Sequence, residues 1–158
     1  MREYARLCAI ASPLLLGLTI GFPVYESAEP GFAMLSSNVL QAADRSMATW
    51  LLRPAAAISV LMAIQSLTGW HPRVWGWIGL AGSACLFTGA VGVVTAEWPH
   101  IMYDHIIDGE LVPHGPVQAE PSWGLLLVLA AAVSLAVASI LQLVSGRRRA
   151  QISAQLQP

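Results

Sequence analysis

The sequence contains no lysine, and charged residues of all kinds make up only 11% of it. Four long stretches carry no charged side chain, and together they take up more than half of the chain: Leu7–Tyr25, Pro54–Trp70, Val74–Ala96 and Pro121–Gly146. A helix that crosses a bilayer needs about 20 apolar residues, with a range of about 17 to 25, and all four stretches meet this length. The sequence therefore predicts a polytopic membrane protein.

The four stretches predict an all-α membrane protein with a bundle of four transmembrane helices. Lipid offers the backbone no hydrogen-bond partners, so we expect each stretch to be helical, at about 7–25, 52–70, 74–97 and 122–146. Residues 1–158 then form one integral membrane domain, with no room for a second globular unit. The first stretch also fits a cleaved signal peptide, because basic residues precede it and small residues follow, but we expect it to be retained.

Arginines and acidic residues fall on opposite sides of these helices. Six of the eight arginines lie before the first stretch, between the second and third, and after the fourth. All acidic residues but one lie in the other two connections, within 26–50 and 97–120. Arginine-rich segments stay in the cytoplasm, so we expect both termini there, the acidic connections outside, and a bacterial inner membrane as the location. Without lysine or a basic outer patch, nucleic acid is not an expected partner.

Motifs of several common protein classes are missing. The two cysteines, Cys8 and Cys85, belong to no CxxC pair, so we expect them to be packing residues rather than a thiol redox relay. The sequence has no GxSxG, P-loop, dinucleotide-binding, HExxH or CxxCH pattern either. Hydrolase, kinase and haem c functions therefore have no support.

Small residues at four-residue spacing predict which helices touch, because they let membrane helices approach closely. We expect the third and fourth helices to pack along such stripes, and the first helix to carry a comparable notch. The stripes are Ala81/Cys85/Gly89 and Thr88/Gly92/Ala96 in the third helix and Ala130/Ser134/Ala138 in the fourth, and the notch is Gly17/Gly21.

The first outer connection predicts an amphipathic outer helix between helices one and two. From Phe32 to Trp50, apolar residues recur at spacings of three and four. This helix either covers the bundle at the membrane surface or forms the lid of a lipophilic substrate cavity. Glu26 and Arg53 lie at the edge of the hydrocarbon, where ionised groups are usually paired or functional. They can pair with each other, or Arg53 can bind a phenolate or carboxylate of a substrate.

The second outer connection holds most of the titratable candidates. They are His100, His105 and His114 among the carboxylates Glu97, Asp104, Asp108, Glu110 and Glu120. If the third helix continues past residue 99, His100 shares one helix face with the carboxylates at 97, 104 and 108, which suits a general base. Side chains drawn from His100, Asp104, His105 and His114 together with Glu26 also suit a single zinc, iron or copper ion. A solvated acidic loop is the third interpretation.

Four short segments carry a likeness to a known family. They are Gly21-Phe22-Pro23-Val24-Tyr25 after the first helix, Met47-Ala48-Thr49-Trp50 after the amphipathic segment, Arg53-Pro54 at the second helix and Glu97-Trp98-Pro99-His100 after the third. In their order, the chain resembles the anthrone oxygenase-like family of small four-helix membrane proteins. The resemblance implies an oxidoreductase, a monooxygenase that converts a lipophilic aromatic polyketide-type substrate, such as an anthrone, to a quinone.

The resemblance also implies roles for individual residues. An anthrone is acidic at its methylene carbon, and the anion left by proton removal can react with O2 directly, without a flavin or haem. The implied catalytic set is His100 as the base and Arg53 as the anion site, with Asp104 and Glu26. The implied substrate-binding set is Trp50, Trp98, Tyr103 and His105.

Two further classes of function stay open. One is a non-enzymatic membrane subunit whose outer segments dock a partner, and the other is a metal-binding membrane protein that uses the outer histidines. The expected partners are the lipid bilayer and, for the enzyme, a lipophilic small molecule. A homo-oligomer is compatible with each class.

Overall fold

The computed structural model describes residues 2–27, 47–68, 72–95, 104–107, 110–113 and 119–155. Its helices are α1 (Arg2–Leu18), the short α3 (Met47–Trp50), α4 (Leu52–Thr68), α5 (Pro72–Thr95) and α6 (Trp123–Gln155). The four long helices correspond to the four uncharged stretches, so the expectation of four long helices is confirmed. Of the expected amphipathic helix at 32–50, only 47–50 lie within the described residues, as α3.

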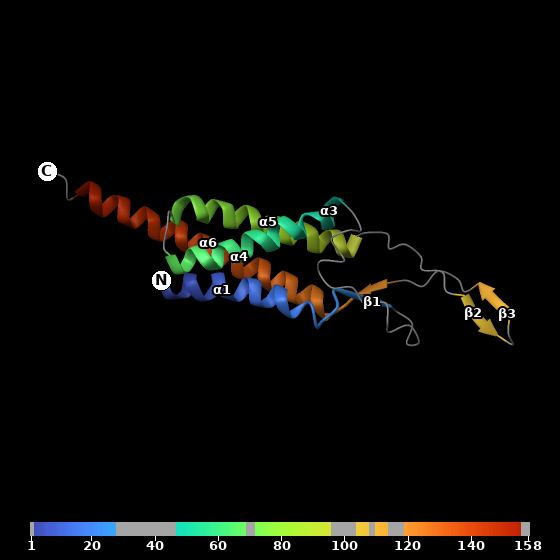
Figure 1. Ribbon diagram of the computed structural model, residues 1–158. Helices are drawn as coiled ribbons and strands as arrows, with labels where there is room; N and C mark the ends of the chain where they lie inside the picture. Colours follow the sequence, from blue (N-terminus) through green and yellow to red (C-terminus); the bar gives the residue numbers. More distant parts are fainter. Residues whose placement is uncertain are drawn as a thin grey trace.

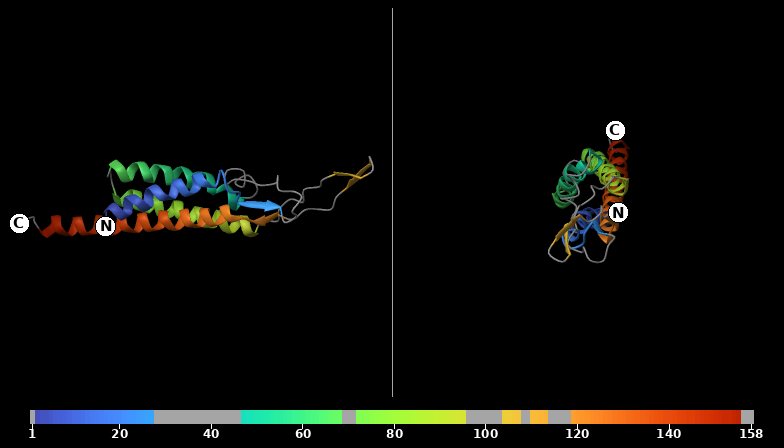
Figure 2. Two further views of the ribbon diagram at one scale, coloured as in Figure 1. Left: turned by 90° about the horizontal axis from the view of Figure 1, so that it is seen from below. Right: turned by 90° about the vertical axis from the view of Figure 1, so that its right-hand side faces the viewer.

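The four long helices form an elongated bundle in which successive helices run in opposite directions (Figure 1). Each helix packs against two others, in the cyclic order α1, α4, α5, α6. Helices α1 and α5 therefore lie on one diagonal of the bundle, and α4 and α6 on the other. The chain termini lie at one end, and α6 continues past the other helices there (Figure 2).

Four short strands occur in the connections. Strand β1 (Tyr25–Ser27) pairs antiparallel with β4 (Ala119–Pro121), and β2 (Asp104–Ile107) pairs antiparallel with β3 (Glu110–Pro113). We refer to the end of the bundle that carries α3, β1 and β4 as the sheet end. The opposite end, with Arg2, Arg6, Arg73 and residues 147–149 of α6, is the arginine end.

The first helix stops earlier than expected. It was expected to run to residue 25, but α1 ends at Leu18, and backbone hydrogen bonds from Ile20 to Gly17 (3.1 Å) and from Gly21 to Leu18 (3.0 Å) form a turn. Pro23 has no N–H to continue the helix and disfavours a helical conformation in the residue before it. The chain after Pro23 is therefore free to become strand β1.

Helices α5 and α6 are the two segments long and apolar enough to cross a membrane by length and composition. The qualifying segments are Arg73–Thr95 and Trp123–Gly146, and α4 is a shorter apolar helix. Only 39% and 44% of the residues in the two hydrophobic windows are buried. A core helix of a soluble protein would bury most of its residues. More than half of the residues in each of these two windows are instead exposed or only partly buried.

The contact between α5 and α6 is confirmed, and the stripes predicted for α5 are partly right. Ala81 and Thr88 are exposed, whereas Gly89 and Gly92 are buried and Cys85 packs against the core. Close approaches also occur at Gly76, Gly79 and Gly82: a Cβ on Gly79 would meet both Ser139 of α6 and Met62 of α4. Because α5 contacts both α4 and α6, its contact face is broader than the predicted stripes.

The notch predicted in α1 is also wrong. A Cβ on Gly17 would meet nothing within 4 Å, and one on Gly21 would meet only the carbonyl oxygen of Leu18, at 3.7 Å. Neither glycine lies against another helix in the described residues. Instead, Ser12 provides the close contact of α1, because its Oγ donates a hydrogen bond of 3.0 Å to the carbonyl oxygen of Ala131 in α6.

Serines tie the helices to α6 near its middle. Ser59 Oγ of α4 donates to Ser12 Oγ at 2.8 Å, which extends the bond from Ser12 to Ala131 into a chain through three helices. From the other side, Ser83 Oγ of α5 donates to the carbonyl oxygen of Ala132 at 2.8 Å. The adjacent carbonyl oxygens of Ala131 and Ala132 in α6 thus accept hydrogen bonds from α1 and from α5. Helix α6 is therefore bonded to the helices on both of its sides.

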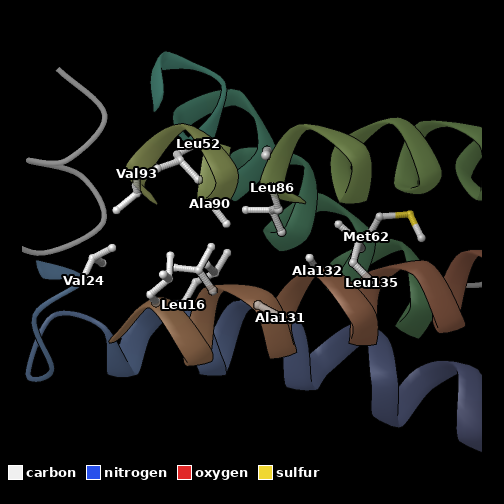
Figure 3. Close-up of a cluster of buried hydrophobic side chains, with 13 residues drawn as sticks. Leu16, Val24, Leu52, Met62, Leu86, Ala90, Val93, Ala131, Ala132 and Leu135 are labelled. Atoms are coloured by element: carbon white, nitrogen blue, oxygen red, sulfur yellow. The ribbon is translucent and has the colours of Figure 1, made fainter. Parts of the chain in front are cut away.

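An apolar cluster fills the half of the bundle nearer the sheet end (Figure 3). Its larger members come from all four long helices and from the segment after α1. They are Leu16, Val24, Leu52, Met62, Leu86, Val93, Leu125, Val128 and Leu135. This core fixes the sheet end relative to the helices.

Candidate functional site

The sheet end brings together the beginning of the first connection and the end of the second. Beyond the ladder of β1 and β4, Ser122 N donates to the carbonyl oxygen of Val24 at 2.9 Å and Gly124 N donates to that of Pro23 at 2.8 Å. A Cβ on Gly124 would collide with the backbone of Phe22 and Pro23. The glycine therefore permits this approach, and the two acidic connections meet at one end of the bundle.

Two carboxylate residues occupy opposite positions of this ladder. The register pairs Glu26 with Glu120, Tyr25 with Pro121 and Ser27 with Ala119. Like charges directly opposite each other on neighbouring strands repel and weaken the ladder. The pair of strands is short, so its position depends on the backbone bonds to Pro23 and Val24 described above.

Arg53 lies at the sheet end with an aromatic partner. Its guanidinium carbon lies 5.8 Å from the centre of the Trp50 ring, within the range of a cation–π contact. Trp50 is 60% exposed, and Arg53 is exposed as well. The contact holds a cation beside a flat apolar surface, which is an arrangement suited to an aromatic anion.

This contact was not predicted, although both residues were candidates. Trp50 ends α3 and Arg53 is the second residue of α4. Their spacing of three residues at a helix start was the signal in the sequence, since residues three apart lie on one helix face.

Most of the candidates in the second connection lie outside the described residues. Trp98, His100, Tyr103 and His114 are among them. Asp104 and His105 belong to strand β2, where they pair with Pro113 and Val112. The expected helical stripe is therefore wrong at Asp104, because α5 ends at Thr95 and a strand replaces the helix.

Sequence reasoning missed a polar pair inside the bundle. Gln142 Nε2 of α6 donates a 3.0 Å hydrogen bond to Gln65 Oε1 of α4, across the diagonal of the bundle and towards the arginine end. The two residues are only 7% and 5% exposed. Neither glutamine is ionised, so the charge pattern of the sequence did not distinguish them from the other residues of the uncharged stretches.

The pair is incompletely satisfied. Gln142 Oε1 is buried and has no hydrogen-bond partner among the described residues. An unpaired buried acceptor costs about 1–3 kcal/mol relative to its hydrated state. Replacing both amides by apolar residues removes that cost. Replacing only one of them leaves the other amide buried without a hydrogen-bond partner. The pair therefore contributes more to the specificity of helix register than to stability.

The described residues contain no group of three or more histidine, cysteine, aspartate or glutamate side chains able to hold a metal ion. The metal hypothesis concerned His100, Asp104, His105, His114 and Glu26, whose side chains lie outside the described part of the chain. It stays a hypothesis.

Comparison of the chain with models of known protein families, with curated proteins and with solved structures finds no match.

Proposed function

We propose that the protein is an integral membrane protein in which all four long helices cross the bilayer. The observation that carries this proposal is the distribution of polarity in the bundle. Large apolar side chains are exposed along every long helix, among them Leu14, Leu61, Phe87, Val133 and Ile140. Soluble proteins rarely expose continuous apolar surface of this extent.

The interior contains polar side chains as well as the apolar core. Ser12, Ser59, Ser139, Gln65 and Gln142 are buried, and their hydrogen bonds connect helices or helix turns. In lipid, association of helices relies on close packing and such bonds, because burying leucine against leucine gains little over burying it against lipid. Polar contacts inside and apolar residues outside are what a bilayer selects.

The two shorter helices fit the same arrangement. Helix α4 has 17 residues, or about 25 Å at 1.5 Å per residue, slightly less than the hydrocarbon thickness, and the part of α1 after Arg6, Leu7–Leu18, covers about 18 Å. Arg6 and Arg53 lie near their ends, where long side chains reach the headgroups and relieve a mismatch. The arginine end then faces the cytoplasm and the sheet end faces outward.

Cysteine labelling tests this topology. In a background of Cys8→Ala and Cys85→Ala, we expect a membrane-impermeant maleimide to label Glu120→Cys only from the outside and Ala150→Cys only from the cytoplasm. Val133→Cys, which is exposed on the middle of α6, should resist labelling in membranes and react after transfer to denaturant. Rapid labelling of Val133→Cys in intact membranes would contradict the proposal, because that position would then contact water.

We further propose that the sheet end acts on a lipophilic aromatic substrate as an oxygenase. Support comes from Arg53 against Trp50 and from the meeting of both acidic connections at this end. The methylene of an anthrone loses a proton to a base, the role assigned to His100, and Arg53 stabilises the anion. O2 then accepts the electrons, so that CH2 and O2 become C=O and H2O.

An oxygen-uptake assay on purified protein tests the reaction. With an anthrone as substrate, Arg53→Gln is expected to lower kcat/KM by about 100- to 1,000-fold, the range for loss of one group that stabilises a developing anion. Arg73→Gln, at the other end of the bundle, serves as the matched control and should retain activity. Absence of uptake by the unmodified protein would favour the non-enzymatic subunit, and equal rates for both variants would remove Arg53 from the mechanism.

A further inference from the structure

The arginine end carries a concentration of positive charge that the proposed reaction does not use. The chain as a whole has a formal net charge of −1. The arginine end nevertheless collects six arginines against one acidic residue, Glu3. Among the described residues, Glu26 and Glu120 lie at the other end, in the ladder of β1 and β4.

Arg73 is placed across the neighbouring helix. A Cβ on Gly146 of α6 would lie 3.0 Å from Arg73 Cγ and 3.7 Å from its Nε, so the side chain of Arg73 runs over the bare backbone of that glycine. Arg147, Arg148 and Arg149 follow immediately in the same helix. The absence of a side chain at 146 thus brings the guanidinium of α5 beside the first basic residues beyond the apolar part of α6.

Arg6 extends the basic surface to the opposite side of the bundle. Its Nε donates a 3.1 Å hydrogen bond to the carbonyl oxygen of Ser66 at the end of α4, and its Nη1 lies 3.5 Å from Glu3 Oε1. The Arg6 side chain is 44% exposed, so part of it remains accessible from outside the bundle. The bond to Ser66 holds the guanidinium of Arg6 against the end of α4, so the group does not extend freely into water.

The arginine end borders the exposed apolar surface of the bundle. Tyr4 and Trp77 are exposed beside Arg6 and Arg73, and tyrosine and tryptophan are enriched where a membrane protein meets the headgroups. Helix α6 continues unbroken to Gln155, which holds residues 147–149 in the turn directly below the apolar segment. The arginines therefore lie at headgroup depth.

We propose that the arginine end binds the phosphate groups of anionic phospholipids, with Arg73 and the arginines of α6 as the main contacts. Guanidinium groups bind phosphate with two parallel hydrogen bonds, and clusters of arginine next to a membrane helix attract anionic headgroups. The arginine end lies at the edge of an apolar surface. A lipid would contact both the arginines and that apolar surface, whereas a soluble acidic peptide would contact only the arginines, so the position favours a lipid. This inference rests on the proposed membrane embedding.

Spin-label spectroscopy in reconstituted membranes tests both steps separately. The protein is reconstituted in phosphatidylcholine containing a trace of spin-labelled phosphatidylglycerol or spin-labelled phosphatidylcholine. Lipid at the protein surface gives a motionally restricted signal, and its fraction yields the relative association constants of the two lipids. We expect phosphatidylglycerol to be preferred by about fivefold or more, the contribution of a single arginine near an anionic headgroup.

Three variants assign the preference to the arginine end. Arg73→Gln and the triple change Arg147→Gln, Arg148→Gln and Arg149→Gln should each lower it severalfold. Gly146→Leu keeps every charge but displaces the side chain of Arg73, and it should lower the preference as well. Gly17→Leu changes no charge and lies where a Cβ meets nothing within 4 Å, so it is the control for the substitution at Gly146 and should leave the preference unchanged.

The outcomes separate the two proposals. Absence of a restricted signal with either lipid overturns the membrane embedding. A restricted signal without preference, or a preference that survives both arginine variants, overturns the lipid site alone. Loss of the preference on adding soluble polyglutamate at constant ionic strength would show that the arginine end prefers an acidic peptide, and would also overturn it. Circular dichroism of each variant verifies that the helices persist.

Discussion

Replacing Gly124 by alanine is expected to destabilise the protein by about 3–5 kcal/mol, from the strain of overpacking together with two weakened backbone hydrogen bonds. The new methyl group would meet the carbonyl oxygens of Phe22 and Pro23, which are backbone atoms and cannot rotate away. Alanine gains up to about 1 kcal/mol over glycine in helix propensity, which is too little to reverse the sign. The segment from Pro23 to Ser27 should separate from the start of α6.

The measurement is unfolding by denaturant in detergent, followed by circular dichroism and by protease cleavage near β1. Gly17→Ala is the matched control, because a Cβ there meets nothing within 4 Å, and it should leave the free energy of unfolding unchanged or slightly raised. A Gly124→Ala protein as stable as the control would mean that the approach of Pro23 to α6 does not exist in the folded protein.

Substituting Gly79 by leucine is expected to force the helices of the bundle apart. Gly79 lies where α4, α5 and α6 meet, and its Cβ would already overlap Ser139 Oγ and come within 2.8 Å of Met62 Cε. Ser139 cannot simply retreat, since its Oγ donates a 2.7 Å bond to the carbonyl oxygen of Leu135 within α6. Leucine adds three further carbons, so we expect a loss of about 3 kcal/mol or more.

A second substitution distinguishes steric conflict from a general defect. Shortening the opposing side chain with Met62→Ala creates space, so the double variant should be more stable than the sum of the two single effects indicates. Gly17→Leu should be tolerated, because that glycine faces away from the other helices in the described residues. Additive losses in Gly79→Leu with Met62→Ala would show that the two residues do not share the same space.

The number of long helices followed from the sequence because each of the four long charge-free stretches corresponds to one long helix. How the helices contact each other did not follow. The predicted stripes included the exposed residues Ala81 and Thr88 and left out Gly79, which contacts both α4 and α6. The burial of Gln65 and Gln142 was not predicted, because nothing in the neighbouring sequence shows whether these side chains point into or out of the bundle.

The connections were harder to predict for a different reason. The hairpin of β2 and β3 does carry a local signal, since Asp108-Gly109 between short apolar runs favours a two-residue turn. The helical spacing of the histidine and carboxylates obscured it. The ladder of β1 and β4 has no such signal, because three residues are too few for an alternating pattern and the partners are far apart in sequence.

That ladder also constrains the order in which the protein can be made. Tyr25–Ser27 leaves the ribosome long before Ala119–Pro121, so the first strand has no partner while α4 and α5 are being made. The ladder can form only after the start of α6 has been synthesised. Its pairing is therefore a late step of folding, and a chain that ends before residue 119 leaves the edge of the first strand without its partner strand.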